Sequence, residues 1–407
     1  MRAFFRKPSA QIIYGLIVGQ AFVLAVTPIL TRQFSTEEMG AAAVFLAVAT
    51  IAATAGTVRL ELLIPTAAAA ALHWMARLAL VVLACVGVIV GAGMTMFAGF
   101  DVVEGALLAV TTVAIGAVGL TMQLNARVGA FQGIALAKGG QGILQGGTQV
   151  LLGAASQTTY GIPIGWAVAY VGASAIQSIS YRRARPSPAR DHIRFRERLL
   201  ILRRGLALTA SAIINVSAVS LLPLITGFFF GEHATGELSV AQRLAVAPAG
   251  LLVAALVPVA ANSFGGLIRE GQPINSAVRS WIARLLPFGA VFGIALVAVP
   301  EEWLRIFLGE GWEDVKGYLG ALAAGIAVQV VAGPLGQLLA LQGRAIAQFA
   351  WDAARLIALL LTTSAVALVS RDPVLTTFAG ASVLAVFYVA FVVIVLMPHP
   401  SVPQSNN

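Results

Sequence analysis

The chain alternates between long apolar segments and short polar ones, a pattern typical of helices that cross a lipid bilayer. A helix needs about 20 mostly apolar residues to span the hydrocarbon layer. Twelve segments meet this requirement, and they cover residues 11–30, 41–64, 76–97, 103–122, 134–155, 162–181, 206–229, 238–261, 282–299, 318–341, 346–369 and 374–397. The fifth departs from the ideal pattern through Lys138 and its many glycines, and the ninth is short and contains Pro287.

An arginine-rich run separates the first six segments from the last six. It holds nine arginines between Arg182 and Arg204, and its prolines Pro186 and Pro188 break any helix that crosses its start. The predicted organisation is an N-terminal six-helix lobe (residues 1–181), an arginine-rich cytoplasmic linker (182–205), a C-terminal six-helix lobe (206–397) and a short cytoplasmic tail (398–407).

The positions of the charges predict the orientation of the chain. Cytoplasmic loops of membrane proteins carry an excess of Lys and Arg. With the N-terminus in the cytoplasm and the first span uncleaved, the outer loops hold only four basic residues, Arg32, Arg305, Lys316 and Arg371, while most acids lie outside. One missed or added span would destroy this pattern. We therefore expect twelve spans with both termini in the cytoplasm.

Short motifs recur at corresponding places in the two halves. The turn FSTEEMG at residues 34–40 corresponds to FGEHATG at 230–236, and each runs from a phenylalanine to the glycine that opens the next span. Because each half has six spans, the two copies share one orientation, with a site expected at their interface. The predicted fold is all-α and integral to the membrane, with twelve transmembrane helices in two six-helix lobes related by a pseudo-twofold axis along the membrane normal.

Composition supports this class and excludes others. The 407 residues are 59% hydrophobic and only 11% charged, whereas soluble domains carry roughly 25% charged residues. The net charge of +9 is concentrated in the central linker, where anionic lipid headgroups attract it, so we expect no nucleic-acid partner. The single cysteine, Cys85, and four scattered histidines give no metal site.

Two further absences argue against an enzyme. The sequence has no glycine-rich phosphate loop of the GxxxxGK[ST] kind. A membrane polymerase or glycosyltransferase would also need convergent arginines or acids on a sizeable outer loop, and the predicted outer loops are short. We expect a protein without catalytic residues and without a bound cofactor.

Charged groups inside the predicted spans are candidates for function, because burying them in a membrane is costly. The second span carries Arg59 and Glu61, which are two residues apart and so point in different directions on a regular helix. Arg243 in the eighth span has no acid within helical reach. Each arginine either extends to the headgroups or faces an internal cavity that binds an anion.

The eleventh span places Gln348, Asp352 and Arg355 on one helical face, through spacings of four and three residues. One interpretation is an internal ion pair between Asp352 and Arg355, and the other is a polar surface facing a cavity. Glu61 and Asp352 are the only acids that the sequence places inside spans. They are therefore the only candidates that it offers for coupling to a proton or a sodium ion.

The fifth span presents a polar face of another kind, formed by Lys138, Gln141, Gln145 and Gln149. Its Gly142 and Gly146 form a GxxxG motif, which lets helices approach closely. The amides have donors and acceptors suited to sugar hydroxyls. Hydrogen bonding between helices is the alternative role for them.

Four stretches, taken in order and spacing, carry a family resemblance over nearly the whole chain. They are residues 28–48 with RLELLIP at 59–65, NARVGAFQGIALAKGGQGILQ at 125–145, AQRLAVAPAGLLVAALVPVA at 241–260, and FLGEGWEDVKGYLGALA at 307–323 with GPLGQLLALQGR at 333–344. The sequence resembles the polysaccharide-transport flippases of the multidrug/oligosaccharidyl-lipid/polysaccharide exporter superfamily, which include O-antigen and exopolysaccharide repeat-unit flippases.

The resemblance implies a flippase of the bacterial inner membrane. Its substrate would be an undecaprenyl-diphosphate-linked oligosaccharide, moved from the cytoplasmic to the periplasmic leaflet by alternating access for surface polysaccharide or O-antigen synthesis. Arg59 matches an arginine position of the family's second span and is expected to contact the headgroup. Membrane lipids, and a polysaccharide polymerase or chain-length machinery, are the implied partners, with possible coupling to H+ or Na+.

Two alternatives remain at the level of sequence. A cation-coupled drug or metabolite antiporter of the same superfamily would have an acidic, aromatic-lined cavity, whereas arginines and glutamines dominate the candidates here. A membrane polysaccharide polymerase or ligase would have a long outer loop.

Overall fold

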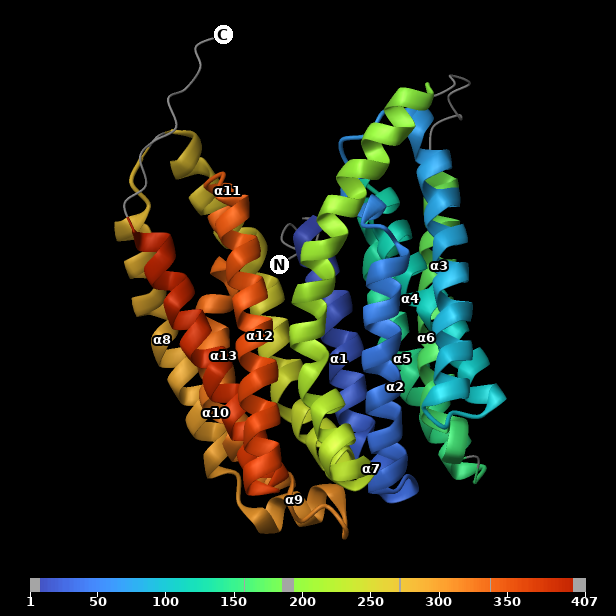
Figure 1. The fold of residues 1–407 in the computed structure, drawn as a ribbon, viewed down its shortest axis with the longest axis vertical. Helices are drawn as coiled ribbons and strands as arrows, with labels where there is room; N and C mark the ends of the chain where they lie inside the picture. The colour runs from blue at the N-terminus through green and yellow to red at the C-terminus, as the bar shows by residue number, and fades with distance from the viewer. Residues whose placement is uncertain (1–7, 157, 185–193, 271, 337, 398–407) are drawn as a thin grey trace.

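Helices form all the regular structure in the part of the chain that the computed structural model describes, residues 8–156, 158–184, 194–270, 272–336 and 338–397 (Figure 1). The α-helices are α1 (Pro8–Gln33), α2 (Thr36–Gly56), α3 (Ala69–Phe97), α4 (Val102–Arg127), α5 (Phe131–Ala154), α6 (Thr158–Ala184), α7 (Phe195–Arg269), α8 (Asn275–Ala298), α9 (Glu301–Leu308), α10 (Val315–Ala332), α11 (Leu338–Leu341), α12 (Ala345–Ser370) and α13 (Pro373–Leu396). Two 3-10 turns, η1 (Leu60–Leu63) and η2 (Gly333–Leu335), follow α2 and α10.

The twelve predicted spans are confirmed. Ten helices in the described ranges are long and apolar enough to cross a membrane. The long helix α7 counts once among them but contains two spans, because its backbone reverses at Gly231, with φ 82° and ψ −173°. The helix α5 is not among the ten, yet it lies within the bundle and completes the twelve.

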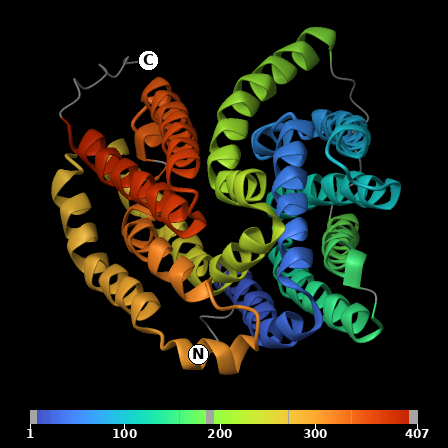
Figure 2. The same cartoon turned by 60° about the horizontal axis from the view of Figure 1, so that its bottom comes forward.

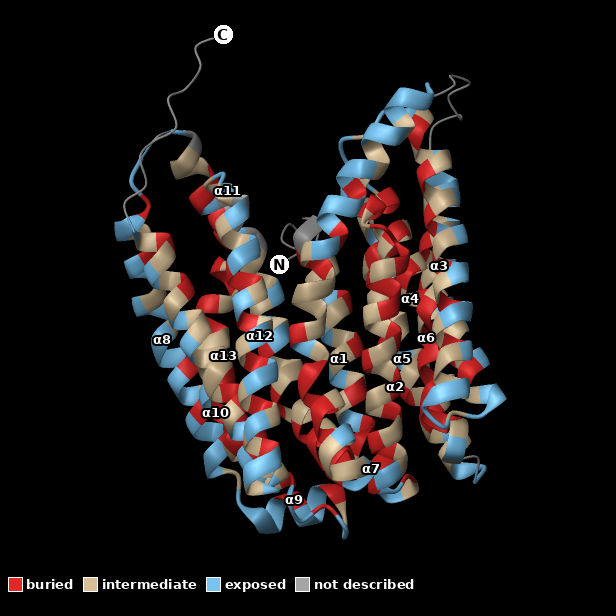
Figure 3. Ribbon diagram, in the orientation of Figure 1, coloured by how far each residue is buried: buried red, intermediate tan, exposed pale blue. Residues whose placement is uncertain are grey.

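The spans form two lobes with six spans each. Helices α1 to α6 pack into an N-terminal lobe, and α8, α10, α12 and α13 pack with α7 into a C-terminal one, with α7 between the two groups (Figure 2). Along most of α3 and α8 the exposed residues are apolar, such as Val88, Ile89, Val291 and Ile294, as a lipid-facing surface requires (Figure 3).

The two membrane faces are easily distinguished. We call the face where α6 ends and α7 begins the linker face, and the opposite face, which carries α9, the α9 face (Figure 1). The sequence predicts that the linker face is cytoplasmic. Helices α6 and α7 both extend into the predicted linker, to Ala184 and from Phe195, while residues 185–193 and the predicted tail lie outside the described residues.

Local sequence explains the turns at the α9 face. Ser35 and Glu38 form a capping box that starts α2, and Asp101 and Glu104 form another that starts α4. The Tyr160 hydroxyl also donates to Asp101, which together with the Glu104 amide holds the pKa of that carboxyl below its ordinary value.

Two predicted spans end earlier than expected. The second was predicted as continuous to residue 64, but α2 ends at Gly56, and the next turn contains Val58 and Arg59 in the left-handed region, with φ 48° and 49°. The tenth was predicted to residue 341, but α10 ends at Ala332 because Pro334 cannot continue an α-helix.

The lobes meet at the α9 face through a close contact between α2 and α7. A Cβ atom added to Gly236 would lie 1.8 Å from the Thr36 carbonyl oxygen, and one added to Gly40 would lie 1.9 Å from the Glu232 carbonyl oxygen. His233 Nδ1 lies 2.7 Å from Thr36 Oγ1, across the same contact. Only residues without a side chain allow the two backbones to approach this closely.

The helix α9 joins the lobes a second time. Its last carbonyl groups have no partner within the helix, and they accept hydrogen bonds from α1 of the other lobe. Arg32 donates to Ile306 O at 2.7 Å and to Phe307 O at 2.9 Å, and the Thr31 hydroxyl donates to Leu308 O at 2.7 Å. The positive Arg32 also complements the negative end of the helix dipole. The N-terminal lobe therefore caps a helix of the C-terminal lobe.

The glycine contact gives a testable prediction. Gly236→Ala is expected to force α2 and α7 apart at the α9 face and to lower the stability of this arrangement by about 1 to 3 kcal/mol, the usual cost of overpacking. Thermal unfolding of the purified protein would measure the change.

Gly250→Ala is the matched control, because nothing lies within 4 Å of the added Cβ. It should be neutral or stabilising by up to about 1 kcal/mol, since alanine favours a helix more than glycine does. Equal unfolding temperatures for the two variants would contradict the proposed role of the contact.

Candidate functional site

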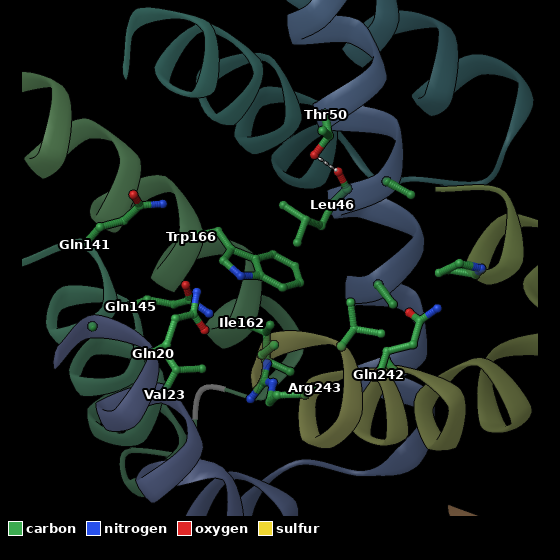
Figure 4. A pocket seen from close by; sticks show the side chains of 18 of the residues that line it. Gln20, Val23, Leu46, Thr50, Gln141, Gln145, Ile162, Trp166, Gln242 and Arg243 are labelled. Carbon is green, nitrogen blue, oxygen red and sulfur yellow. Dashed lines mark hydrogen bonds between the residues drawn. The ribbon is translucent and has the colours of Figure 1, made fainter. Parts of the chain in front are cut away.

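A cavity of about 570 Å³ lies between the lobes, lined by α1, α2, α5, α6 and both halves of α7 (Figure 4). Its wall is apolar in part, with Leu16, Val23, Leu46 and Ile162 among its residues. The polar and aromatic side chains that line it are Gln20, Thr50, Lys138, Gln141, Gln145, Trp166, Tyr170, Ser220, Ser239, Gln242 and Arg243. The contacts between α1, α2, α7 and α9 described above lie on the α9 side of this cavity.

Close packing of α1 against α5 brings one group of these side chains together. A Cβ added to Gly142 of α5 would lie 2.2 Å from the Gly19 carbonyl oxygen of α1, so the two backbones touch there, as the GxxxG motif predicts. The contact places Gln20 of α1 next to Gln145 of α5 at the cavity wall (Figure 4). Gln141 and Lys138 lie on the same face of α5, one and two turns closer to the linker face than Gln145.

The cavity contains two cations and no acid. Lys138 comes from the N-terminal lobe and Arg243 from the second half of α7, and neither forms a salt bridge within the described residues. The Nη1 atom of Arg243 is buried and has no hydrogen-bond partner among these residues. No Asp or Glu is among the lining residues. Because buried charges are normally paired, the cavity is suited to an anionic ligand.

Aromatic side chains form another part of the wall. Trp166 and Tyr170 lie one turn apart on α6 and both line the cavity. The Trp166 ring stacks on Phe45 of α2, with 6.3 Å between the ring centroids and 13° between the planes. The Tyr170 hydroxyl is hydrogen-bonded to the Gln141 side chain. A rigid indole beside several amides can contact both faces and edges of a sugar ring.

Gln149 lies outside the cavity, although the sequence grouped it with Lys138, Gln141 and Gln145. Its side chain is fully buried, and its Nε2 donates to the Ile162 carbonyl at 3.3 Å. The amide thus links α5 to α6, the interhelical role that the sequence left open.

Arg59 and Glu61 also lie outside the residues that line the cavity. Arg59 Nη1 forms a salt bridge with Glu61 Oε1 at 3.0 Å. The expectation that these two side chains point in different directions is wrong, because the helix has ended and Arg59 takes a left-handed conformation. The Thr57 hydroxyl donates to the same Glu61 oxygen at 3.3 Å.

The eleventh-span residues form a separate cluster within the C-terminal lobe. Arg355 and Asp352 are buried and form an ion pair at 3.2 Å. The Asp352 carboxylate also accepts hydrogen bonds from Asn215 at 3.1 Å and from Gln348 at 3.3 Å. The Arg355 guanidinium lies 4.6 Å from the centroid of the Trp351 ring. The carboxylate is therefore neutralised and hydrogen-bonded inside its own lobe.

The lining residues that sequence reasoning missed include Gln20, Trp166, Tyr170 and Gln242. Gln20 is the one amide in the middle of an otherwise apolar first span, and Gln242 precedes Arg243. Both are polar residues within predicted spans, which is the signal that could have found them. The two aromatic residues carry no such signal, because aromatic side chains are common throughout membrane helices.

Several solved structures have a fold similar to that of this chain. Among solved structures, the lipid II flippase MurJ in an inward closed conformation matches with a TM-score of 0.68 at 12% identity, over 93% of this chain and 86% of that chain. The Vibrio cholerae MATE transporter VcmN matches with a TM-score of 0.62 at 12% identity, over 97% and 95%. The MATE transporter ClbM in complex with Rb+ matches with a TM-score of 0.60 at 12% identity, over 97% and 95%. At these identities the similarity is one of fold.

The sequence comparison adds the family. No curated protein matches the chain. A family model described as polysaccharide biosynthesis protein matches residues 29–316, well over half of the sequence. The chain therefore belongs to the polysaccharide biosynthesis protein family, and its fold is that of the flippases and transporters of the multidrug/oligosaccharidyl-lipid/polysaccharide exporter superfamily.

Proposed function

We propose that the protein is a flippase for an undecaprenyl-diphosphate-linked oligosaccharide, which it moves from the cytoplasmic to the periplasmic leaflet of the bacterial inner membrane. The observation that carries the proposal is the cavity between the lobes, with Lys138 and Arg243 in its wall and no acid beside them. A diphosphate is the kind of anion that such a pair would bind.

The chemistry of the substrate explains why such a cavity is needed. A diphosphate cannot cross hydrocarbon unaided, because an isolated ion loses its hydration there at a cost of many kcal/mol. Charge-assisted hydrogen bonds from a lysine and an arginine replace part of that hydration. Gln20, Gln141 and Gln145 would then contact sugar hydroxyls, with Trp166 against a ring face. The polyprenyl tail would stay in the bilayer.

The arrangement of the lobes supports movement by alternating access. The hydrogen bonds that join α1 and α2 to the C-terminal half lie at the α9 face among the described residues. Toward the linker face α8, α12 and α13 diverge from the N-terminal lobe, while the first half of α7 packs on that lobe, with Gly205 against Val58 (Figure 1). With the linker face in the cytoplasm, as the charges predict, this form would receive a headgroup from the cytoplasmic leaflet. Polymerisation outside, or ion coupling, would bias net transport.

The two cavity cations give a testable prediction. Lys138→Ala and Arg243→Ala are each expected to weaken binding of a polyprenyl-diphosphate oligosaccharide by about 10- to 100-fold, because a hydrogen bond to a charged group contributes about 1.5 to 3 kcal/mol. Arg243→Lys should recover part of the affinity, since it keeps the charge. Native mass spectrometry of the purified protein with the lipid-linked oligosaccharide would measure the affinities.

Arg182→Ala removes an exposed arginine at the end of α6, far from the lining, and serves as the control. In cells, the two cavity variants should accumulate lipid-linked repeat units on the cytoplasmic leaflet, whereas the control should not. Wild-type affinity in both cavity variants would sink the proposal. Altered sensitivity to cationic drugs with unchanged polysaccharide would favour the antiporter instead.

A separate prediction distinguishes a structural role of Arg59 from a role in binding. Arg59→Ala leaves the Glu61 carboxylate, which is 5% exposed, without its salt bridge. We expect lower stability and reduced surface polysaccharide, and recovery of both in the double variant Arg59→Ala, Glu61→Gln, which removes the unpaired charge. Complementation of a deletion strain at matched expression tests this. Failure of the double variant, while it is stable, would instead support headgroup contact by Arg59.

A further inference from the structure

Glu237 is a buried acid that directly precedes the eighth predicted span. The acids that are almost fully buried in the described residues are Glu61, Glu237 and Asp352, with 5%, 2% and 3% exposure. Arg59 neutralises Glu61, and Arg355 neutralises Asp352. No lysine or arginine of the described residues forms a salt bridge with Glu237. The most buried of the three acids is therefore the one without a cation.

The groups around Glu237 offer it little compensation. Its Oε1 accepts a hydrogen bond from the Asp314 backbone amide at 3.0 Å. The charged groups that act on it are Asp314, Glu313 and His233, of which two are acids. Tyr318 on α10 is fully buried, its hydroxyl has no hydrogen-bond partner among the described residues, and it lies within electrostatic range of Glu237 and of Asp372.

Contacts between the lobes flank Glu237 on two sides. The preceding residue, Gly236, touches the backbone of α2 at Thr36, and His233 one turn earlier lies 3.1 Å from Glu37 of α2. The loop that donates the Asp314 amide is itself tied to α1, because Trp312 Nε1 donates to the Thr31 carbonyl at 3.0 Å. Separation of α1 and α2 from the C-terminal lobe would therefore give water access to Glu237.

We propose that Glu237 is a proton-binding site whose occupancy is coupled to closure of the lobes at the α9 face. In the closed form an ionised Glu237 would be desolvated without a counter-charge, so the neutral acid is favoured. In the open form the carboxylate would be hydrated and ionised near neutral pH. Closing the α9 face then takes up one proton, and opening it releases one.

Proton linkage gives the direction in which pH shifts the equilibrium between the closed and open forms. The closed form binds the proton more tightly than the open form, so falling pH favours closure and rising pH favours opening. Coupling to one proton changes the closed-to-open ratio by up to about tenfold per pH unit between the two titrations. If the α9 face is periplasmic, which rests on the proposed function, an acidic periplasm would return the flippase to its substrate-receiving form.

Double electron–electron resonance measures the distance between two spin labels, and so can report separation of the lobes directly. Phe97 and Val369 lie at the α9-face ends of α3 and α12, in different lobes, and are 89% and 87% exposed. The exposed Cys85 is first replaced by alanine. Labels at Phe97→Cys and Val369→Cys in the full chain, reconstituted in lipid nanodiscs, would then report the distance distribution from pH 5 to pH 8.5.

We expect the short-distance population to grow as pH falls in the otherwise wild-type protein. Glu237→Gln mimics the neutral acid and should hold the short distance at every pH. Glu237→Asp should retain the pH response, which shows that the acid itself is needed. Glu232→Gln, an exposed acid of the same turn, should behave as wild type.

His233 is the competing sensor, because its protonation would strengthen its contact with Glu37. His233→Asn should keep the pH response if Glu237 is the site. The proposal is overturned if Glu237→Gln responds to pH as wild type does, if the response disappears in His233→Asn alone, or if the wild type does not respond. A shift caused by exchanging sodium for choline at fixed pH would assign the site to a metal cation instead. None of these readouts requires transport of an oligosaccharide.

Discussion

A lysine and an arginine from opposite sides of the cavity face a shared volume without a carboxylate beside them. Bringing uncompensated cations out of water is costly, and proteins usually avoid it or pair them. Two of the three almost fully buried acids of the described residues are paired with an arginine, Glu61 with Arg59 and Asp352 with Arg355. The contrast supports the proposal that a ligand supplies the counter-charge of the cavity. Packing of the lobes, through the glycine contacts and the turn at Gly231, holds Lys138 and Arg243 at the same cavity.

Hydropathy and charge distribution were sufficient to predict the twelve spans and the two lobes, because a bilayer allows few other solutions for such a chain. The ends of the spans were harder to predict from the sequence. Val58 and Arg59 adopt a left-handed turn that apolar periodicity does not reveal, so α2 appeared longer than it is. The break after α10 depends on Pro334, a signal that was present in the sequence but subordinate to the apolar run around it.

Part of the candidate site could also be predicted from the sequence. Lys138, Gln141 and Gln145 are polar residues on one face of one helix, and helical spacing alone groups them. It could not separate them from Gln149, because the Ile162 carbonyl that binds Gln149 lies on another helix. Likewise, the partners of Asp352 include Asn215, which is 137 residues away in sequence. Interhelical neighbours decide which polar residues face a cavity, and a single sequence does not show them.

The polarity of α5 has a consequence for synthesis of the protein. This helix is not among those apolar enough to span a membrane on their own, because it carries Lys138 and the glutamines that face the cavity. Its backbone contact with α1, at Gly142 and Gly19, and its hydrogen bond to α6 supply what its composition lacks. Partitioning of a nascent helix into lipid depends on its own residues unless a neighbour shields the polar ones. We therefore expect stable insertion of α5 by the translocon to await α1 and α6, so a helix that contributes three polar side chains to the cavity is one whose biogenesis is cooperative.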